Sequence, residues 1–155
     1  MMKAMRAKIF RRSDERGAAL LEFAIGATLF LSASFAVIEV GRLLWVHNSL
    51  VDATRRAARY AVNQGMSTGA QTQAKNMAVY GNTGGTGQPL VQDLEPTHVK
   101  LTYQNFELGG GTVTAEIENY DFKFVLPLVN KTMRLPAYKT SLTGENAGYV
   151  PTVIP

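Results

Sequence analysis

The run AALLEFAIGATLFLSASFAVIEV, from Ala18 to Val40, constrains the fold more than any other part of the chain. Only Glu22 and Glu39 interrupt its apolar and small side chains. A helix of about 20 apolar residues, rising 1.5 Å per residue, crosses the roughly 30 Å hydrocarbon core of a bilayer. The sequence therefore predicts one transmembrane helix over residues 18–41.

The net charge of the chain is concentrated ahead of this run. Residues 1–17 contain six basic and two acidic side chains, which accounts for the whole formal net charge of +4. Basic residues that flank a membrane helix remain on the cytoplasmic side, so residues 1–17 are predicted to be a cytoplasmic leader and residues 42 onward to be periplasmic. Because the rest of the chain sums to zero, no basic surface for nucleic acid is expected.

An ordinary secretory signal peptide is the alternative for this region, since it also combines basic residues, an apolar core and small residues at a cleavage site. Its site would be supplied by Ser32, Ala33, Ser34 and Ala36. However, the apolar run continues to Val40 without a helix breaker, and Glu22 interrupts the supposed apolar core. Both features favour a retained helix.

Helical periodicity continues beyond the apolar run. No glycine or proline occurs from residue 42 to 64, and Gly65 is the expected stop, which predicts one helix from about Ala18 to Gln64 with a periplasmic extension over 42–64. One face of the extension is apolar and the other is charged, with Asp52 placed to pair with Arg56. The apolar face comprises Leu43, Val46, Leu50, Ala53, Ala57 and Ala61, and the charged face comprises Asp52, Arg55, Arg56 and Arg59.

Residues 65–155 are predicted to be a small C-terminal α+β region. A short helix is expected from about Thr68 to Tyr80, because small and apolar residues there share one face. The following segment GNTGGTGQP is read as a loop.

Alternation with a period of two then indicates antiparallel strands within about residues 98–126. A glycine turn at 109–111 joins two of them, the inward-facing set slips by one residue at Asn119, and AYKTSL from Ala137 is a candidate third strand. A sheet this small is marginal alone, so we expect it to pack on the apolar face of the helix. The expected fold class is α+β, a long N-terminal helix with a small antiparallel sheet.

The residue pattern gives no catalytic set, and we expect no enzyme activity, cofactor or metal site. The two histidines, His47 and His98, lie far apart and lack a motif partner, so a surface or satisfied core role is expected for each. Glu116 and Glu118 fall on one polar strand face, the usual arrangement for solvated carboxylates. The chain has no cysteine, which rules out a disulfide or a thiolate site.

A stripe of small residues runs along the membrane helix, since Ala24, Thr28, Ser32 and Ala36 recur every four residues. Small side chains allow helices to approach closely in lipid. This stripe is a candidate helix-packing surface.

The segment RGAALLEF around Gly17 carries a resemblance to known proteins. It resembles the processing site of type IV pilin-like proteins, in which a prepilin peptidase cuts after a glycine and glutamate becomes the fifth mature residue. Here that places the cut between Gly17 and Ala18, with Glu22 as the fifth residue and Phe23 as the aromatic that follows it in the Flp/Tad branch. A glycine also leaves the segment at the cut extended and deformable ahead of a rigid helix.

A second motif narrows the resemblance to the TadE-like family. Its members show a Glu-aromatic-Gly-Arg group at the end of the membrane helix, and Glu39, Gly41 and Arg42 match while Val40 replaces the aromatic residue. The resemblance implies a pilin-like minor pilin, or pseudopilin, of a Flp/Tad type IV pilus system that acts structurally in pilus biogenesis and adhesion.

The same resemblance implies a location and partners. The protein would cross the bacterial inner membrane once, with its N-terminus cytoplasmic and its C-terminus periplasmic, and could enter the pilus. Its expected partners are the prepilin peptidase, other Tad pilins and minor pilins, and the inner-membrane assembly platform. Two other functions remain open at this stage: an unprocessed bitopic periplasmic scaffold, and a secreted binding domain released by ordinary signal peptidase.

Overall fold

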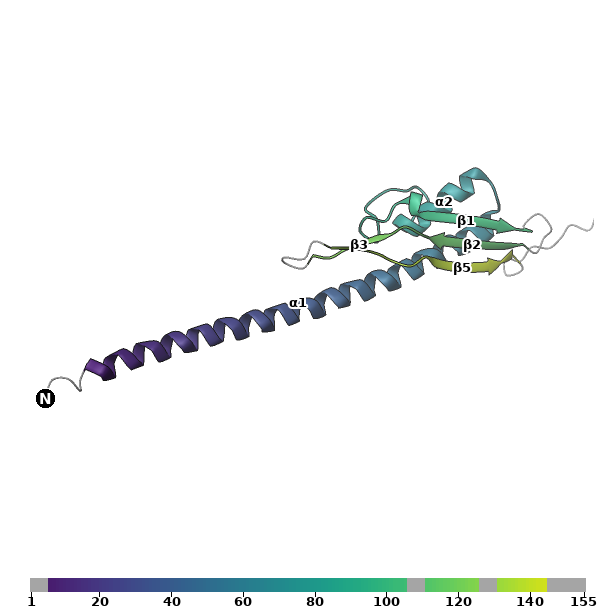
Figure 1. The fold of residues 1–155 in the computed structure, drawn as a ribbon. Helices are drawn as coiled ribbons and strands as arrows, with labels where there is room; N and C mark the ends of the chain where they lie inside the picture. The colour runs from purple at the N-terminus through teal and green to yellow at the C-terminus, as the bar shows by residue number, and fades with distance from the viewer. Residues whose placement is uncertain (1–5, 106–110, 126–130, 145–155) are drawn as a thin grey trace, which may run out of the picture. The chain divides into compact units, whose positions relative to one another are not determined.

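The computed structural model describes residues 6–105, 111–125 and 131–144, with side chains described from residue 17 onward. The chain divides into two units at the Gly41–Arg42 bond, and each is described by itself. Figure 1 shows the elements, which are the helices α1 (Arg6–Gln64) and α2 (Thr68–Tyr80), the 3-10 turn η1 (Pro96–His98), and the strands β1 (Val99–Gln104), β2 (Thr112–Ile117), β3 (Asp121–Lys123), β4 (Thr132–Arg134) and β5 (Tyr138–Thr143). This architecture confirms the predicted α+β class.

Helix α1 begins at Arg6, so the predicted start at Ala18 is wrong. Residues 6–16 contain neither glycine nor proline and are rich in Arg, Lys, Ala and Glu, which favour helix. The helix therefore continues through Gly17, although a glycine costs about 1 kcal/mol relative to alanine inside a helix. The backbone at Gly17 is helical, where the sequence suggested an extended segment.

The end of α1 and all of α2 agree with the prediction. Helix α1 ends at Gln64, and Gly65 has the left-handed φ of 76° that stops a helix. Helix α2 begins after Ser67, whose hydroxyl accepts a hydrogen bond from the Ala70 amide at 3.2 Å. It ends at Gly81, which also has a positive φ.

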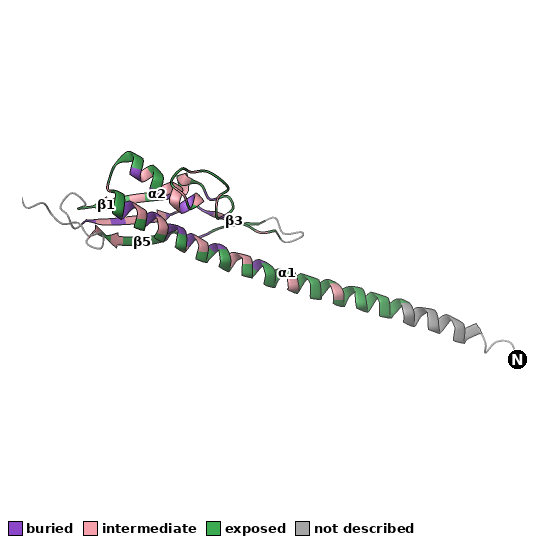
Figure 2. Ribbon diagram, turned by 180° about the vertical axis from the view of Figure 1, so that it is seen from behind, coloured by how far each residue is buried: buried purple, intermediate pink, exposed green. Residues whose placement is uncertain are grey.

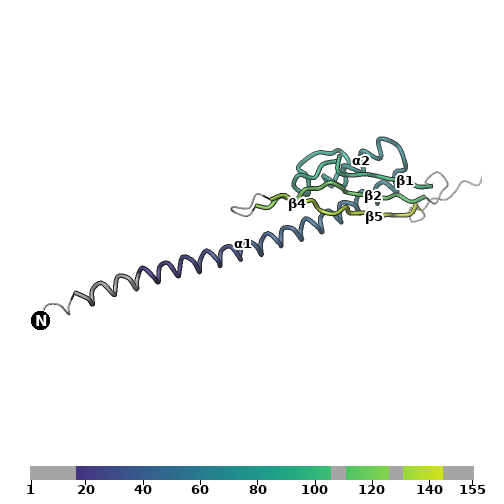
Figure 3. Tube along the Cα trace, in the orientation of Figure 1, coloured from purple at the N-terminus to yellow at the C-terminus, as the bar shows by residue number. Residues whose placement is uncertain are grey.

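The main sheet has three antiparallel strands in the order β1-β2-β5. The register pairs Leu101 with Ala115 and Ala115 with Thr140, so the predicted hairpin and the predicted third strand are both confirmed. Figure 3 traces β5 along the outer side of β2. Of the predicted glycine turn, residues 109 and 110 lie outside the described part of the chain.

A bend at Asn119 separates β2 from a second, two-stranded sheet, β3-β4. Asn119 has a φ of 61°, and Tyr120 and Phe122 beyond it are buried, as the shifted alternation predicted. Strand β4 was not predicted. Its three residues are all exposed, so no alternation marked it in the sequence.

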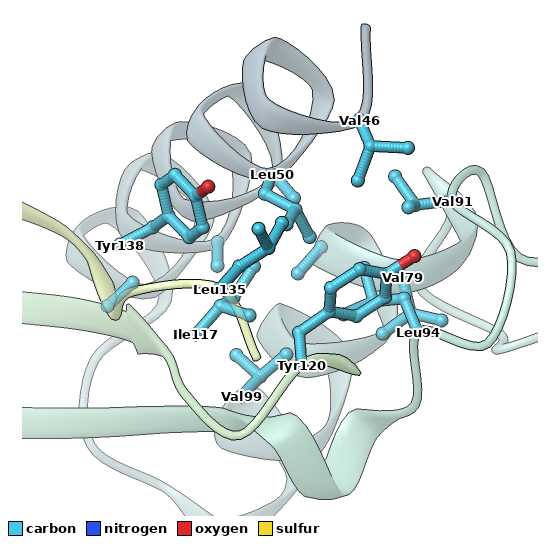
Figure 4. Close-up of a cluster of buried hydrophobic side chains, with 14 of the residues drawn as sticks. Val46, Leu50, Val79, Val91, Leu94, Val99, Ile117, Tyr120, Leu135 and Tyr138 are labelled. Carbon is cyan, nitrogen blue, oxygen red and sulfur yellow. The ribbon is translucent and has the colours of Figure 1, made fainter. Parts of the chain in front are cut away.

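The core of the second unit lies between α1, α2 and the strands (Figure 4). Helix α1 contributes more residues to this core than α2 does, and they come from the apolar face predicted for the α1 extension. Leu50, Ala53 and Ala57 on this face have no exposed surface. Phe122 is 1% exposed, and the side chains of Leu94 and Ile117 are fully buried. Packing on this helix face supplies the apolar cover that so small a sheet lacks alone.

Polar contacts fix the helix against the edge strand β5. The hydroxyl of Thr54, which is 1% exposed, lies 2.8 Å from the hydroxyl of Thr140. About two turns earlier along α1, His47 Nδ1 lies 3.0 Å from the Tyr138 hydroxyl. These two contacts join α1 to β5 at positions 47 and 54 of the helix.

The predicted pair between Asp52 and Arg56 is not formed. Asp52 instead contacts Arg55 at 3.5 Å, and Arg56 donates hydrogen bonds to the carbonyl oxygens of Met77 at 3.3 Å and Ala78 at 3.2 Å. The last carbonyl groups of a helix lack partners within it and carry partial negative charge. Arg56 therefore joins the C-terminal end of α2 to α1.

Truncation of Leu50 is expected to destabilise the second unit. Leu50→Ala removes buried volume from the centre of the core, which costs about 2–5 kcal/mol of the free energy of unfolding. Denaturant titration of the detergent-solubilised chain, followed by Trp45 fluorescence, measures this loss. Leu44→Ala is the matched control, because Leu44 lies on the same helix but is 57% exposed. Equal losses in the two variants would contradict the described core.

Candidate functional site

The helix segment of the first unit exposes its apolar side chains over its whole described surface. From Gly17 to Ile38 no described residue is buried (Figure 2). The exposed side chains include Leu20 at 71%, Phe30 at 71% and Val37 at 73%. Among the described residues this is one helix that by length and composition is long and apolar enough to cross a membrane. Lipid or other helices are the surroundings that suit such a surface, and the chain is compatible with a single-pass membrane protein.

The processing residues predicted from the sequence lie on successive turns of this exposed helix. Gly17, Ala18, Glu22 and Phe23 are all exposed, and Phe23 is 74% exposed. A Cβ atom added at Gly17 would meet nothing within 4 Å. The fold of the described chain therefore does not require glycine at position 17.

The small-residue stripe forms one continuous line on the helix surface, with Ala24, Thr28, Ser32 and Ala36 all exposed. The Thr28 hydroxyl donates to the Ala24 carbonyl at 2.7 Å, and the Ser32 hydroxyl donates to the Thr28 carbonyl at 2.8 Å. Hydroxyl groups that are satisfied within the helix cost little in lipid. The side chains of the stripe are thus small, and its hydroxyl groups already have hydrogen-bond partners, which suits close packing of helices.

A hollow next to the stripe was not recognised in the sequence. It is lined by Phe23, Gly26, Ala27, Phe30 and Leu31. The spacing of three, four and seven residues between these positions is the signal that would have found it, because such residues share one helix face. A Cβ atom at Gly26 would also meet nothing within 4 Å.

The motif after the membrane run divides between the two units. Glu39 is 6% exposed and Gly41 has open space around its Cα. Arg42 is the first residue of the second unit, and its guanidinium lies 4.2 Å from the centre of the Phe122 ring. Its Nη2 donates to the Lys123 carbonyl oxygen. Arg42 therefore holds β3 against the start of the folded unit by a cation–π contact and a hydrogen bond.

Removal of the Arg42 charge is expected to loosen this attachment. Arg42→Gln loses the cation–π contact and the charged hydrogen bond, so the free energy of unfolding should fall by about 1–3 kcal/mol. Arg55→Gln is the control, because its exposed pair with Asp52 is expected to contribute under about 1 kcal/mol. Denaturant titration of both variants makes the comparison. An Arg42→Gln loss no greater than that of Arg55→Gln would contradict the structural role.

Charged residues around Arg42 are paired with one another. Lys123 Nζ lies 2.7 Å from Asp93 Oδ2, and Arg134 Nε lies 3.0 Å from Asp121 Oδ1. Hydrogen bonding from Arg134 holds the pKa of the Asp121 carboxyl below its ordinary value, so this pair persists at neutral pH. Such paired, exposed charges are typical of a structural surface.

The histidines also have structural partners. His47 contacts Tyr138, and His98 Nδ1 accepts a hydrogen bond from the Glu95 amide at 3.0 Å. Within residues 17–105, 111–125 and 131–144 no group of His, Cys, Asp and Glu side chains is arranged to hold a metal ion. What the geometry does provide is an exposed apolar helix.

Residues 17–59 match the family model of TadE-like protein. The match begins at Gly17 and confirms the resemblance found in the sequence. It includes the residues predicted to direct processing, the small-residue stripe and the motif at Glu39, Gly41 and Arg42. Searches of curated proteins and of solved structures found no match.

The TadE-like segment thus joins the exposed helix to the first part of the folded unit. It ends at residue 59, inside the part of α1 that carries the core residues Leu50, Ala53 and Ala57. The match makes this segment similar to TadE-like proteins. The sheets and α2 lie outside the matched residues.

Proposed function

We propose that this chain is a TadE-like minor pilin, or pseudopilin, of a Flp/Tad type IV pilus system. It inserts into the bacterial inner membrane with residues 1–17 in the cytoplasm and the folded unit in the periplasm. A prepilin peptidase cuts between Gly17 and Ala18, and the mature helix packs laterally against other pilins at the assembly platform. Its work in pilus biogenesis and adhesion is structural.

The observation that carries this proposal is the TadE-like match, which starts at Gly17 and covers the exposed apolar part of α1. The surroundings of Gly17 support it further. Since no neighbouring atom in the described chain excludes a side chain there, a requirement for glycine would come from an external partner. A peptidase that must bind the backbone closely is such a partner.

Cleavage would also give Glu22 a function. It lies one turn from the new amino group of Ala18, near the positive end of the mature helix, where a carboxylate is favoured. The amine of a neighbouring subunit would then offset the cost of a charge in the membrane, which is about 2.5–3.5 kcal/mol at the bilayer centre. Helix packing along the small-residue stripe would follow in the same register.

A deletion strain tests this function. Loss of the gene should reduce surface pili and attachment, and expression of the full chain should restore both. A chain that lacks residues 42–155 but keeps the membrane helix is expected not to restore them, because the folded unit is absent. Normal pili and attachment in the deletion strain would contradict a role in biogenesis and adhesion.

A further inference from the structure

The β3–β4 hairpin is attached to α1 where the apolar run ends. Arg42 contacts the Phe122 ring and donates to the Lys123 carbonyl, and Arg42 follows the last apolar residue of the run, Val40, by two positions. Two backbone hydrogen bonds flank the paired residues of the hairpin. The Leu135 amide donates to the Tyr120 carbonyl oxygen at 3.0 Å, and the Phe124 amide donates to the Lys131 carbonyl oxygen at 3.0 Å. Strand β3 is therefore attached to α1 at Arg42, the first residue of the folded unit.

Large apolar side chains are exposed at this same place. Trp45 is 56% exposed, and Val125, two residues beyond β3, is 73% exposed. Trp45 and Val125 line one small pocket, of about 120 Å³, together with Lys123. Trp45 of the helix and Val125 after β3 thus present apolar surface side by side.

The charge of the hairpin is basic. Its described residues include Lys123, Lys131 and Arg134, all exposed, against the single acid Asp121. Asp93, from the loop before η1, pairs with Lys123. These three basic side chains outnumber the two acids, so the surface keeps a small excess of positive charge, which complements phosphate headgroups.

The position of Trp45 along the helix identifies what this surface meets. Trp45 follows Val40 by five residues, which is about 8 Å of helix rise. Tryptophan at that distance from a hydrocarbon core lies at headgroup level, where its ring is favoured. We propose that Trp45, Val125 and the basic side chains of β3 and β4 form a membrane-contacting surface that lies in a layer of anionic lipid headgroups. This inference requires α1 to span the membrane, but not that it be cleaved or assembled into a pilus.

Single-cysteine labelling tests the proposal, because the chain has no cysteine of its own. Val125→Cys reports on the hairpin, Ser141→Cys on the outward face of β5, and Phe30→Cys on the membrane run. Each full-length variant carries an environment-sensitive fluorophore and is reconstituted in vesicles with and without phosphatidylglycerol. Quenching by aqueous iodide then measures how far each label is exposed to water.

We expect the Val125 label to be protected several-fold relative to the Ser141 label, more strongly in the anionic vesicles. Trp45, the one tryptophan of the chain, should be quenched more by lipids brominated near the headgroup than by lipids brominated near the chain end. Lys131→Glu should reduce the protection of the Val125 label in anionic vesicles, and Lys131→Arg should preserve it. The reason is that the charge at position 131 faces the same headgroups.

Two outcomes would overturn the surface while leaving the membrane helix intact. One is a Val125 label as accessible as the Ser141 label while the Phe30 label is protected. The other is protection of Val125 only when other pilus proteins are added, which would make the partner a protein. Iodide access at Phe30 would refute the spanning helix itself, and with it this proposal. Cleavage at Gly17 is measured separately, by the mass of the mature chain.

Discussion

Gly17→Leu is expected to abolish maturation of the chain, so that only the precursor accumulates in the membrane fraction. A Cβ atom at this position meets nothing within 4 Å, and leucine is a strong helix former, so the substitution should not harm the helix itself. The loss would therefore arise in the peptidase site, where a backbone without a side chain is required. Immunoblotting against a C-terminal tag separates precursor from mature chain.

Gly26→Leu is the matched control for this substitution. Gly26 lies in the same helix with equally open surroundings, but nine residues beyond the proposed cut. We expect Gly26→Leu to be processed as the unmodified chain is. A normal processed band from Gly17→Leu would refute the cleavage site, and loss of processing in both variants would point to general misinsertion of the helix.

Glu22→Ala is expected to reduce assembly far more than cleavage. If Glu22 pairs with the amine of a neighbouring subunit in the membrane, its removal leaves that charge unpaired, which costs about 2–5 kcal/mol per contact. A loss of about 2 kcal/mol already corresponds to roughly thirtyfold weaker association. Crosslinking of the chain to other pilins in membranes, normalised to the amount of mature chain, measures this effect.

Glu22→Asp serves as the control that keeps the charge one methylene shorter, and it should retain part of the assembly signal. If Glu22→Ala abolishes cleavage as well, the peptidase reads the acid directly. If Glu22→Ala is both cleaved and crosslinked normally, the assembly role of Glu22 is wrong.

Periodicity predicted the parts of the fold whose side chains alternate between core and surface. The apolar face at Val46 and Leu50, the bounds of α2 and the strands around Ala115 all follow from spacing, because burial on one face imposes a regular pattern. The helix ends at Gly65 and Gly81 could be predicted for a different reason. Their left-handed backbone favours glycine, so they mark helix ends in the sequence itself.

The errors arose where local sequence does not decide the structure. The helix starts at Arg6 because Gly17 weakens a helix without ending it. Arg56 donates to the carbonyl groups at the end of α2, which have no hydrogen-bond donor within their own helix. These groups are more than twenty residues away in sequence, so local spacing could not reveal the contact. Strand β4 exists through its pairing with β3, and its exposed residues carry no pattern.

The sequence indicated the candidate residues of the site, but it gave no sign of the contacts around them. The positions of Gly17, Glu22 and Phe23 followed from a motif, and the small-residue stripe followed from spacing. The attachment of β3 by Arg42 could not be predicted, since it joins residues 42 and 122 across the fold. Trp45 was overlooked because its exposure, on which the proposed membrane contact depends, cannot be read from the sequence.

The central claim is that the chain is matured by cleavage between Gly17 and Ala18. The most direct measurement is the intact mass and N-terminal sequence of the protein isolated from the membrane fraction of its own cells. The account predicts a mature chain that begins at Ala18 and retains the whole apolar run. A chain that begins at Met1, or one that begins near Phe35 or Val37 after ordinary signal-peptide cleavage, would contradict it.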